Sequence, residues 1–317
     1  MNTLFRNVFA ILEEMVKISS SAMNCPEGYG AMLIKKLNDC KRGMRMIRQK
    51  CNNDFKGKFS MEEKMLGYSI CLHIDLFLLI WDFFGIEPKK KFEHISDGSN
   101  RMYQIRHFGL FLSNLVNSLL GIHLLIENGL HLQAKQLFRS YIEYADIGIA
   151  VLADQDFYVN YRTMGDSKEQ QDKVWWNYTR PRALNKILEK IFKDEELKDF
   201  WGLYRSIREP MYSHYSDYVH AHHMANLDSA FSYDDQRRKN VISVGGAITS
   251  EMNHTLDSLI LFSRLFIQIA MIVLVKYQRL PFNLFGKDGE EFVAFYSSSE
   301  LIFKYVFIEY RKEDHDL

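Results

Sequence analysis

Proline, glycine and cysteine are scarce in this sequence. Its 317 residues include only 5 prolines and 17 glycines, too few for the many turns of a β-sandwich, a barrel or a propeller. There are four cysteines but no C-x-x-C pair, the usual beginning of a structural zinc site. These scarcities favour a helical fold whose thiols are reduced.

An excess of charge of one sign is also missing. Forty Lys and Arg residues balance forty Asp and Glu residues, which argues against a globally basic nucleic-acid coat or an acidic disordered tail. Hydrophobic residues make up 47% of the chain and charged residues 25%, as in an ordinary globular protein. Any function that depends on charge must therefore be local.

The sequence lacks the common motifs of nucleotide and hydrolase sites. No G-x-x-x-x-G-K-[ST] phosphate loop and no G-x-S-x-G nucleophile elbow occur in it. These absences disfavour nucleotide-dependent enzymes and hydrolases of the Ser-His-Asp class. We expect no cofactor and no resident metal ion.

Uninterrupted apolar runs are few. The N-terminal apolar stretch is broken by Glu13 and Glu14 before it reaches the length of a secretory signal. The most apolar segment, Leu256–Val275, contains Arg264, and an arginine near the middle of a bilayer costs several kcal/mol. We therefore expect this segment to be a central buried helix in a cytoplasmic protein that has no contact with a membrane.

Helical periodicity dominates what is present. It predicts an all-α fold of about ten helices in a multi-helix bundle, with no significant sheet. Asn128-Gly129 separates two long apolar patterns and predicts a helical hairpin, because this pair readily adopts the left-handed cap. A polar, turn-rich stretch at 89–100 suggests an N-terminal helical subdomain (1–98) and a main helical domain (99–317), unless the two form one continuous domain.

The densest group of chemically active side chains follows residue 204. Four of the eleven histidines fall at positions 214, 220, 222 and 223, just after Arg205 and Arg208. A histidine can move a proton near neutral pH, and an arginine can hold a phosphate with two hydrogen bonds. Arg208 and His214, which form an R-x5-H pattern, thus have the groups needed for RNA cleavage without a metal ion.

This pattern resembles the HEPN superfamily of all-helical proteins, whose members are often dimeric ribonucleases or toxins of defence systems. The stretches that bear the resemblance are Leu137–Arg162 and Leu203–Ala221, and the first of them is also similar to a bacterial family of uncharacterised helical proteins. The resemblance implies that His214 is the acid/base and that Arg208 or Arg205 contacts the phosphate. It also implies assembly into a homodimer.

Two features of the motif favour a structural alternative. Glu209, which follows the arginine, would pair with it or repel a phosphate, and Pro210 fits the first turn of a helix but not its interior. We therefore expect Arg208 to precede the helix that contains His214. On one continuous helix, six residues would turn the two positions by about 240° and separate them by about 9 Å along the axis. The alternative is that both side chains satisfy buried polar partners.

Several neighbouring residues are candidates for a supporting role. Arg139 and Glu143 lie four residues apart on one helix face, where they can form an ion pair that anchors the hairpin to the histidine-rich segment. Tyr212 begins a three-residue tyrosine repeat that is more often a packed face than a base-stacking platform. Asp217 and His220 follow on the same helix.

A separate basic stripe lies near the N-terminus. Lys41, Arg45 and Arg48 share one helical face within a segment, 35–58, that has nine basic and two acidic residues. Such a stripe can follow a phosphate backbone, and it can equally be a solvated face or a surface that docks on acidic residues. RNA and a protein partner are both candidate ligands.

A metal site is a further alternative. His214, Asp217 and His220 are spaced by three residues, and Glu251 and His254 form a carboxylate-x-x-His pair typical of di-iron bundles. In this alternative two more carboxylates, Glu127 and Glu143, come from the hairpin.

Three functions stay open from the sequence. The first is a metal-independent endoribonuclease or toxin-like effector in bacterial defence, the second is a non-catalytic helical scaffold that binds a partner, and the third is a metal-binding helical bundle.

Overall fold

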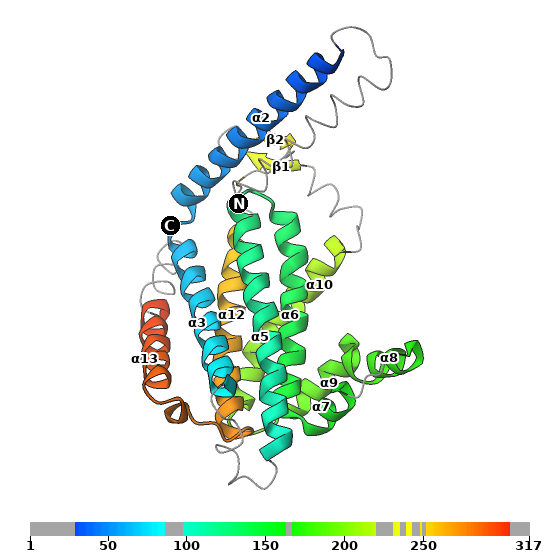
Figure 1. The fold of residues 1–317 in the computed structure, drawn as a ribbon, viewed down its shortest axis with the longest axis vertical. Helices are drawn as coiled ribbons and strands as arrows, with labels where there is room; N and C mark the ends of the chain where they lie inside the picture. Colours follow the sequence, from blue (N-terminus) through cyan, green and yellow to red (C-terminus); the bar gives the residue numbers. More distant parts are fainter. Residues whose placement is uncertain are drawn as a thin grey trace.

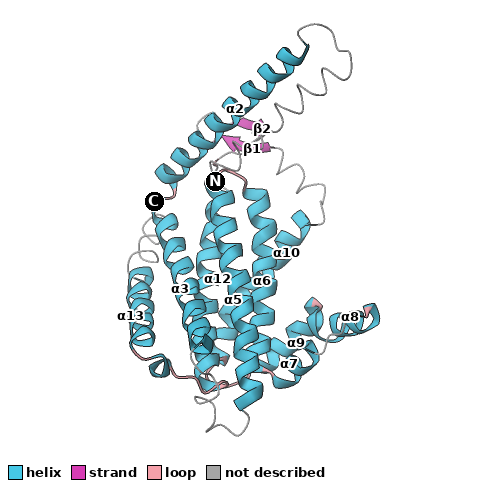
Figure 2. Ribbon diagram, in the orientation of Figure 1, coloured by secondary structure: helices cyan, strands magenta, loops and turns pink. Residues whose placement is uncertain are grey.

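The three-dimensional structure is a computed structural model, and it describes residues 29–85, 98–162, 167–219, 231–234, 239–242, 248 and 252–304. The described residues form ten α-helices, which confirms the predicted all-α bundle (Figures 1 and 2). The α-helices are α2 (Tyr29–Lys58), α3 (Ser60–Gly85), α5 (Gly98–Glu127), α6 (His131–Ala153), α7 (Gln155–Arg162), α8 (Lys168–Val174), α9 (Pro181–Ile191), α10 (Lys198–Val219), α12 (Met252–Lys276) and α13 (Lys287–Ile302).

Three short elements supplement these helices. A π-helical turn, η1 (Trp175–Thr179), joins α8 to α9, and a 3-10 turn, η2 (Phe282–Phe285), precedes α13. The strands β1 (Phe231–Asp234) and β2 (Lys239–Ile242) pair antiparallel, with Phe231 opposite Ile242. This two-stranded ribbon is too small to change the fold class.

The predicted hairpin at Asn128-Gly129 is confirmed. α5 ends at Glu127 and α6 begins at His131. Gly129 has a positive φ of 72°, and the amide of Leu130 donates to the carbonyl of Leu125 at 2.9 Å. This is the hydrogen bond of a Schellman turn, in which a glycine takes the left-handed conformation without steric cost. α5 and α6 therefore pack side by side as an antiparallel pair (Figure 1).

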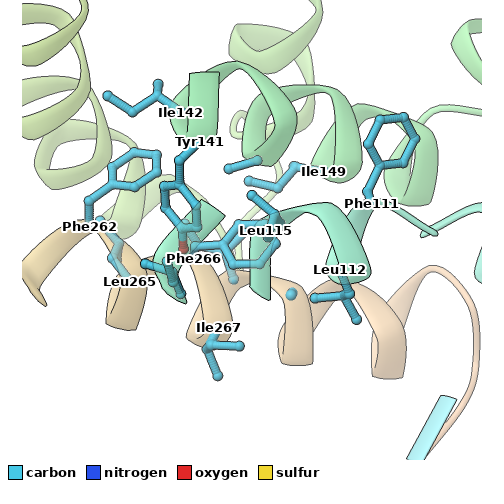
Figure 3. Packing of buried hydrophobic residues seen from close by; sticks show 14 of the residues in the cluster. Phe111, Leu112, Leu115, Tyr141, Ile142, Ile149, Phe262, Leu265, Phe266 and Ile267 are labelled. Atoms are coloured by element: carbon cyan, nitrogen blue, oxygen red, sulfur yellow. The ribbon is translucent and has the colours of Figure 1, made fainter. Parts of the chain in front are cut away.

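The core lies between α3, α5, α6 and α12. Figure 3 shows Tyr141 of α6 between the rings of Phe262 and Phe266 of α12 and the side chain of Leu115 of α5, and all four side chains are completely buried. The hydroxyl of Tyr141 lies 2.8 Å from the Nε2 atom of the buried His73 on α3. Apolar faces spaced by three and four residues on each helix thus close over one another.

The boundary predicted near residue 98 does not separate two cores among the described residues. Buried side chains of α3, such as Leu72 and Leu76, belong to the same hydrophobic cluster as Leu115 of α5 and Phe262 of α12. The division into 1–98 and 99–317 stays a prediction, and the packing of α3 favours the alternative of one continuous domain.

The expectation of a cytoplasmic chain without membrane contact is contradicted. Within the part of the chain that the structure describes, three helical segments are long and apolar enough to cross a membrane, by length and composition: Ser60–Asp82, Arg101–Glu127 and Met252–Lys276. The argument from the cost of a charged Arg264 fails because that side chain is paired, with its Nη2 atom donating to Glu300 of α13 at 2.5 Å. A paired and buried charge does not exclude a segment from a membrane in the way that an isolated charge does.

Candidate functional site

The predicted motif lies on α10, which is a single helix from Lys198 to Val219 with Pro210 in its interior. The expectation that Arg208 precedes the helix of His214 is therefore wrong. The ring of Pro210 leaves the preceding turn without one amide donor, but the packing of α10 on α6 and α12 keeps the helix continuous. On this continuous helix, residues 208 and 214 consequently lie on faces about 120° apart around the axis.

Arg208 is buried, with 3% of its surface exposed. Its Nε atom donates to Oδ2 of Asp146 on α6 at 2.6 Å, and its Nη1 atom donates to Oδ1 of Asn185 on α9 at 2.5 Å. The hydroxyl of Tyr204, one turn earlier on α10, donates to the other oxygen of Asp146 at 2.6 Å. This network joins α6, α9 and α10, and it uses the Nε and Nη1 donors of the guanidinium.

The electrostatics of this network fit a buried ion pair. Burial raises the pKa of the Asp146 carboxyl, while the charge of Arg208 and the hydrogen bond from Tyr204 oppose that rise. Burial lowers the pKa of Arg208, whereas the adjacent carboxylate of Asp146 raises it. The net effect is an increase in the pKa, so the guanidinium keeps its charge. Burial and the adjacent carboxylate also raise the pKa of Tyr204 well above its usual value, which keeps it a donor.

A second network lies beside the first and is partly exposed. The Nε atom of Arg139 donates to Oε1 of Glu143 at 3.3 Å, as the four-residue spacing predicts. The hydroxyl of Tyr212 on α10 donates to the same oxygen at 2.9 Å and accepts from Nη2 of Arg139 at 3.1 Å. These contacts tie the hairpin to the segment that contains the motif, which is the anchoring role predicted for this pair.

The other arginine of the motif faces solvent. The side chain of Arg205 is 52% exposed, and its Nε atom lies 2.8 Å from Oε1 of Glu209. Glu209 thus pairs with Arg205, whereas the sequence suggested that it would pair with Arg208. A surface pair of this type, four residues apart on one helix, contributes at most about 0.5 kcal/mol to stability.

The histidine part of the motif is only partly described. His214 and Asp217 lie on α10, but their side chains are outside the described residues, as are His220 and Glu251 altogether. The position of the His214 side chain relative to either arginine therefore lies outside the described residues, and the catalytic assignment stays a prediction. His254 lies on α12.

The predicted basic stripe lies on α2, which projects obliquely from one end of the bundle (Figure 1). Arg45 and Arg48 are exposed there, and Lys41 belongs to the same helix. Both of the roles considered for this stripe, phosphate contact and a solvated or docking face, stay predictions.

Two tryptophans project from the bundle on η1. Trp175 and Trp176 are 49% and 55% exposed, and their ring centroids lie 5.0 Å apart in an edge-to-face arrangement. The guanidinium carbon of Arg180 lies 4.9 Å from the centre of the Trp176 ring. Sequence analysis did not assign this pair, because two adjacent tryptophans have no periodicity that distinguishes a surface from a core.

Another cluster of polar side chains, at the contact between α3 and α5, was not predicted from the sequence. Ligand atoms of Glu63 on α3 and of His123 and Glu127 on α5 all lie within 4.8 Å of one another. Of these three residues, the sequence suggested only Glu127 as a metal ligand, and it grouped Glu127 with Glu143 and with histidines of other segments. The i, i+4 spacing of His123 and Glu127 is a detectable signal, but the approach of Glu63 depends on how α3 packs against α5.

Comparisons with models of protein families, with curated proteins and with solved structures found no match. The resemblance to the HEPN superfamily therefore rests on the two sequence stretches Leu137–Arg162 and Leu203–Ala221 and stays a prediction.

Proposed function

We propose that this protein is a non-catalytic helical scaffold that binds a protein partner through Trp175 and Trp176. The observation that supports the proposal is the exposure of about half of the surface of each tryptophan on a π-helical turn. The residues that contribute most of the energy in protein–protein interfaces are enriched in tryptophan. π-Helical turns are rare and are frequently found at functional sites.

The surroundings of the pair fit an interface. Figure 1 shows α8 at the end of an arm that leads away from the bundle, and η1 connects this arm to α9. Arg180 stacks on Trp176 and fixes the orientation of its ring through a cation–π contact. Trp175 meets Trp176 edge to face, so the two rings form a preordered apolar surface that loses little entropy on binding.

The state of Arg208 weakens the ribonuclease alternative. Its guanidinium donates to Asp146 and Asn185 and is shielded from solvent, so a phosphate would have to displace a buried carboxylate to reach it. Breaking a buried ion pair leaves an uncompensated charge and is strongly unfavourable. The contacts of Arg208 support a role in holding α6, α9 and α10 together.

The experiment uses a photo-crosslinking amino acid at position 177, an exposed position on the same turn that leaves both tryptophans in place, to identify the partner, followed by binding measurements with the purified pair. Trp176→Ala should weaken binding by about 30-fold, as expected for the loss of a hot-spot residue. Leu203→Ala is the matched control, because Leu203 is a similarly exposed apolar residue, on α10. It should leave the affinity unchanged.

Two results would overturn the proposal. The first is equal affinity of the partner for the wild type and the Trp176→Ala variant. The second is cleavage of RNA by the purified protein in EDTA that His214→Ala abolishes without a change in thermal stability, because this result would establish the catalytic alternative.

A further inference from the structure

The cluster of Glu63, His123 and Glu127, named here the Glu-His-Glu cluster, lies where the beginning of α3 meets the end of α5. Glu63 is in the first turn of α3. His123 and Glu127 are one helical turn apart in the last part of α5, so they occupy the same side of that helix. The packing of α3 against α5 brings together three metal-ligating groups that are about 60 residues apart in the sequence.

The charges of the cluster are incompletely balanced. Neither Glu63 nor Glu127 has an ion pair with a lysine or arginine among the described residues. Among them, the nearest basic group to Glu127 is the imidazole of His123, whose Nε2 atom lies 3.9 Å from Oε1 of Glu127. Other acidic groups that bridge helices in the bundle have a cationic partner, as Asp146 and Glu300 do. Two neighbouring carboxylates repel each other in a partly buried site, and a bound cation would offset that repulsion.

The ligand atoms, all within 4.8 Å of one another, are near enough for side-chain movement to bring them around one ion. Nitrogen and oxygen ligands lie about 2.1 Å from a zinc ion, which places neighbouring ligand atoms about 3.4 Å apart in a tetrahedral site. The 3.9 Å separation of His123 and Glu127 needs only a small side-chain adjustment to reach this value. The side chains of His123 and Glu127 are 25% and 17% exposed, so the cluster is partly enclosed and still open to an ion from solvent.

The imidazole is also supported by its surroundings. The ring of Phe55, which is completely buried on α2, meets the ring of His123 edge-on, with centroids 6.4 Å apart. This contact restricts the rotation of the imidazole and adds α2 to the two helices that provide the ligands. The ligand set is thus built on three helices that are already packed, which reduces the cost of organising it.

We infer that Glu63, His123 and Glu127 bind one divalent transition-metal ion of the zinc type. An imidazole in the ligand set favours zinc, iron, nickel or copper over magnesium and calcium. Three protein ligands leave a fourth position for water, the arrangement of an open zinc site. The ion would join the start of α3 to the end of α5, and this inference does not depend on the proposed function.

The test is calorimetric titration of ZnSO₄ into protein purified without a His tag and treated with EDTA. We expect saturable binding of one ion per chain and a rise in Tm that MgSO₄ does not produce, because an ion that binds only the folded state stabilises it. Glu63→Gln and Glu127→Gln should each weaken zinc binding by at least about 10-fold. The matched control, Glu169→Gln, removes an exposed carboxylate of α8 and should bind zinc as the wild type does.

Three outcomes would overturn the inference: no saturable zinc binding, equal zinc affinity in both variants and the wild type, or binding of magnesium with the same affinity as zinc. The second outcome would place zinc at other side chains, such as the histidines near position 220. Glu63 and Glu127 are on different helices and glutamine is nearly isosteric with glutamate, so a circular dichroism spectrum suffices to verify that each variant is folded.

Discussion

Arg205 and Arg208 lie three residues apart on α10, yet their environments differ completely. The side chain of Arg205 is 52% exposed and pairs with Glu209 on the same helix, whereas that of Arg208 is 4% exposed and pairs with Asp146 of α6. The exposed pair is screened by water and contributes little. The buried pair has been removed from water at a high desolvation cost, so each partner depends on the other.

Asp146→Ala should lower the free energy of unfolding by about 3–5 kcal/mol, because it leaves the charge of Arg208 buried without a partner. Glu209→Gln is the matched control and should cost less than about 1 kcal/mol, since it breaks an exposed pair on the same helix. Urea denaturation of the three proteins measures both values.

The double variant Asp146→Leu/Arg208→Met separates the charge from the packing. Apolar residues of similar volume remove both buried charges, so this variant should be more stable than Asp146→Ala. If Asp146→Ala costs no more than Glu209→Gln, the pair does not have the structural role assigned to it.

Sequence reasoning reached some of these residues and not others. The pair of Arg139 and Glu143 was predictable because the partners are four residues apart on one helix. The pair of Arg208 and Asp146 was not, because 62 residues separate the partners and no local pattern links them. The same holds for Glu63 and His123.

At the level of elements, α10 shows how packing overrides a local preference. A proline in a helix interior removes one amide hydrogen bond and crowds the preceding turn, at a cost of about 3 kcal/mol. α10 nevertheless continues through Pro210, because Tyr204, Arg208 and Met211 on both sides of it are buried against the bundle. The prediction of a helix start at this proline failed for that reason.

Pro210→Ala should raise the Tm, because alanine restores the amide donor and relieves the steric conflict in the interior of α10. Pro181→Ala is the matched control: Pro181 stands in the first turn of α9, where its fixed φ favours the helix. That substitution should lower stability by about 0.4–1 kcal/mol. Differential scanning calorimetry compares the two variants, and a lower Tm for Pro210→Ala would show that the proline is accommodated without strain.

At the level of the whole molecule, one hydrophobic cluster includes residues from α2 to α13. α3, α5 and α12 pack together within it, and each contains a segment long and apolar enough to cross a membrane. The share of the most apolar stretch that is buried inside the bundle is 72% in α12, 50% in α3 and 44% in α5. The apolar character of α12 is thus largely used for contacts inside the bundle, whereas about half of the apolar stretches of α3 and α5 is not buried there.

A single core predicts cooperative unfolding. Amides in the buried parts of α3 and α6 should exchange with solvent through the same global opening, and their exchange free energies should converge as denaturant is added. Amides of α8, a short and mostly exposed helix, should exchange through local opening at lower free energy. Hydrogen-exchange mass spectrometry makes this comparison. A separate and lower free energy for α3 would instead identify residues 1–98 as an independent unit.

The sequence by itself determined the fold class, the hairpin at Gly129 and the pairing of Arg139 with Glu143. These features depend on spacings of a few residues, on turn chemistry and on the scarcity of proline and glycine, all of which are local. Only the tertiary structure decided that Arg208 is enclosed by Asp146 and Asn185, that Glu63 meets His123, and that Trp175 and Trp176 stay exposed. Each of these depends on which helix faces lie against one another, and that is a property of the packed bundle as a whole.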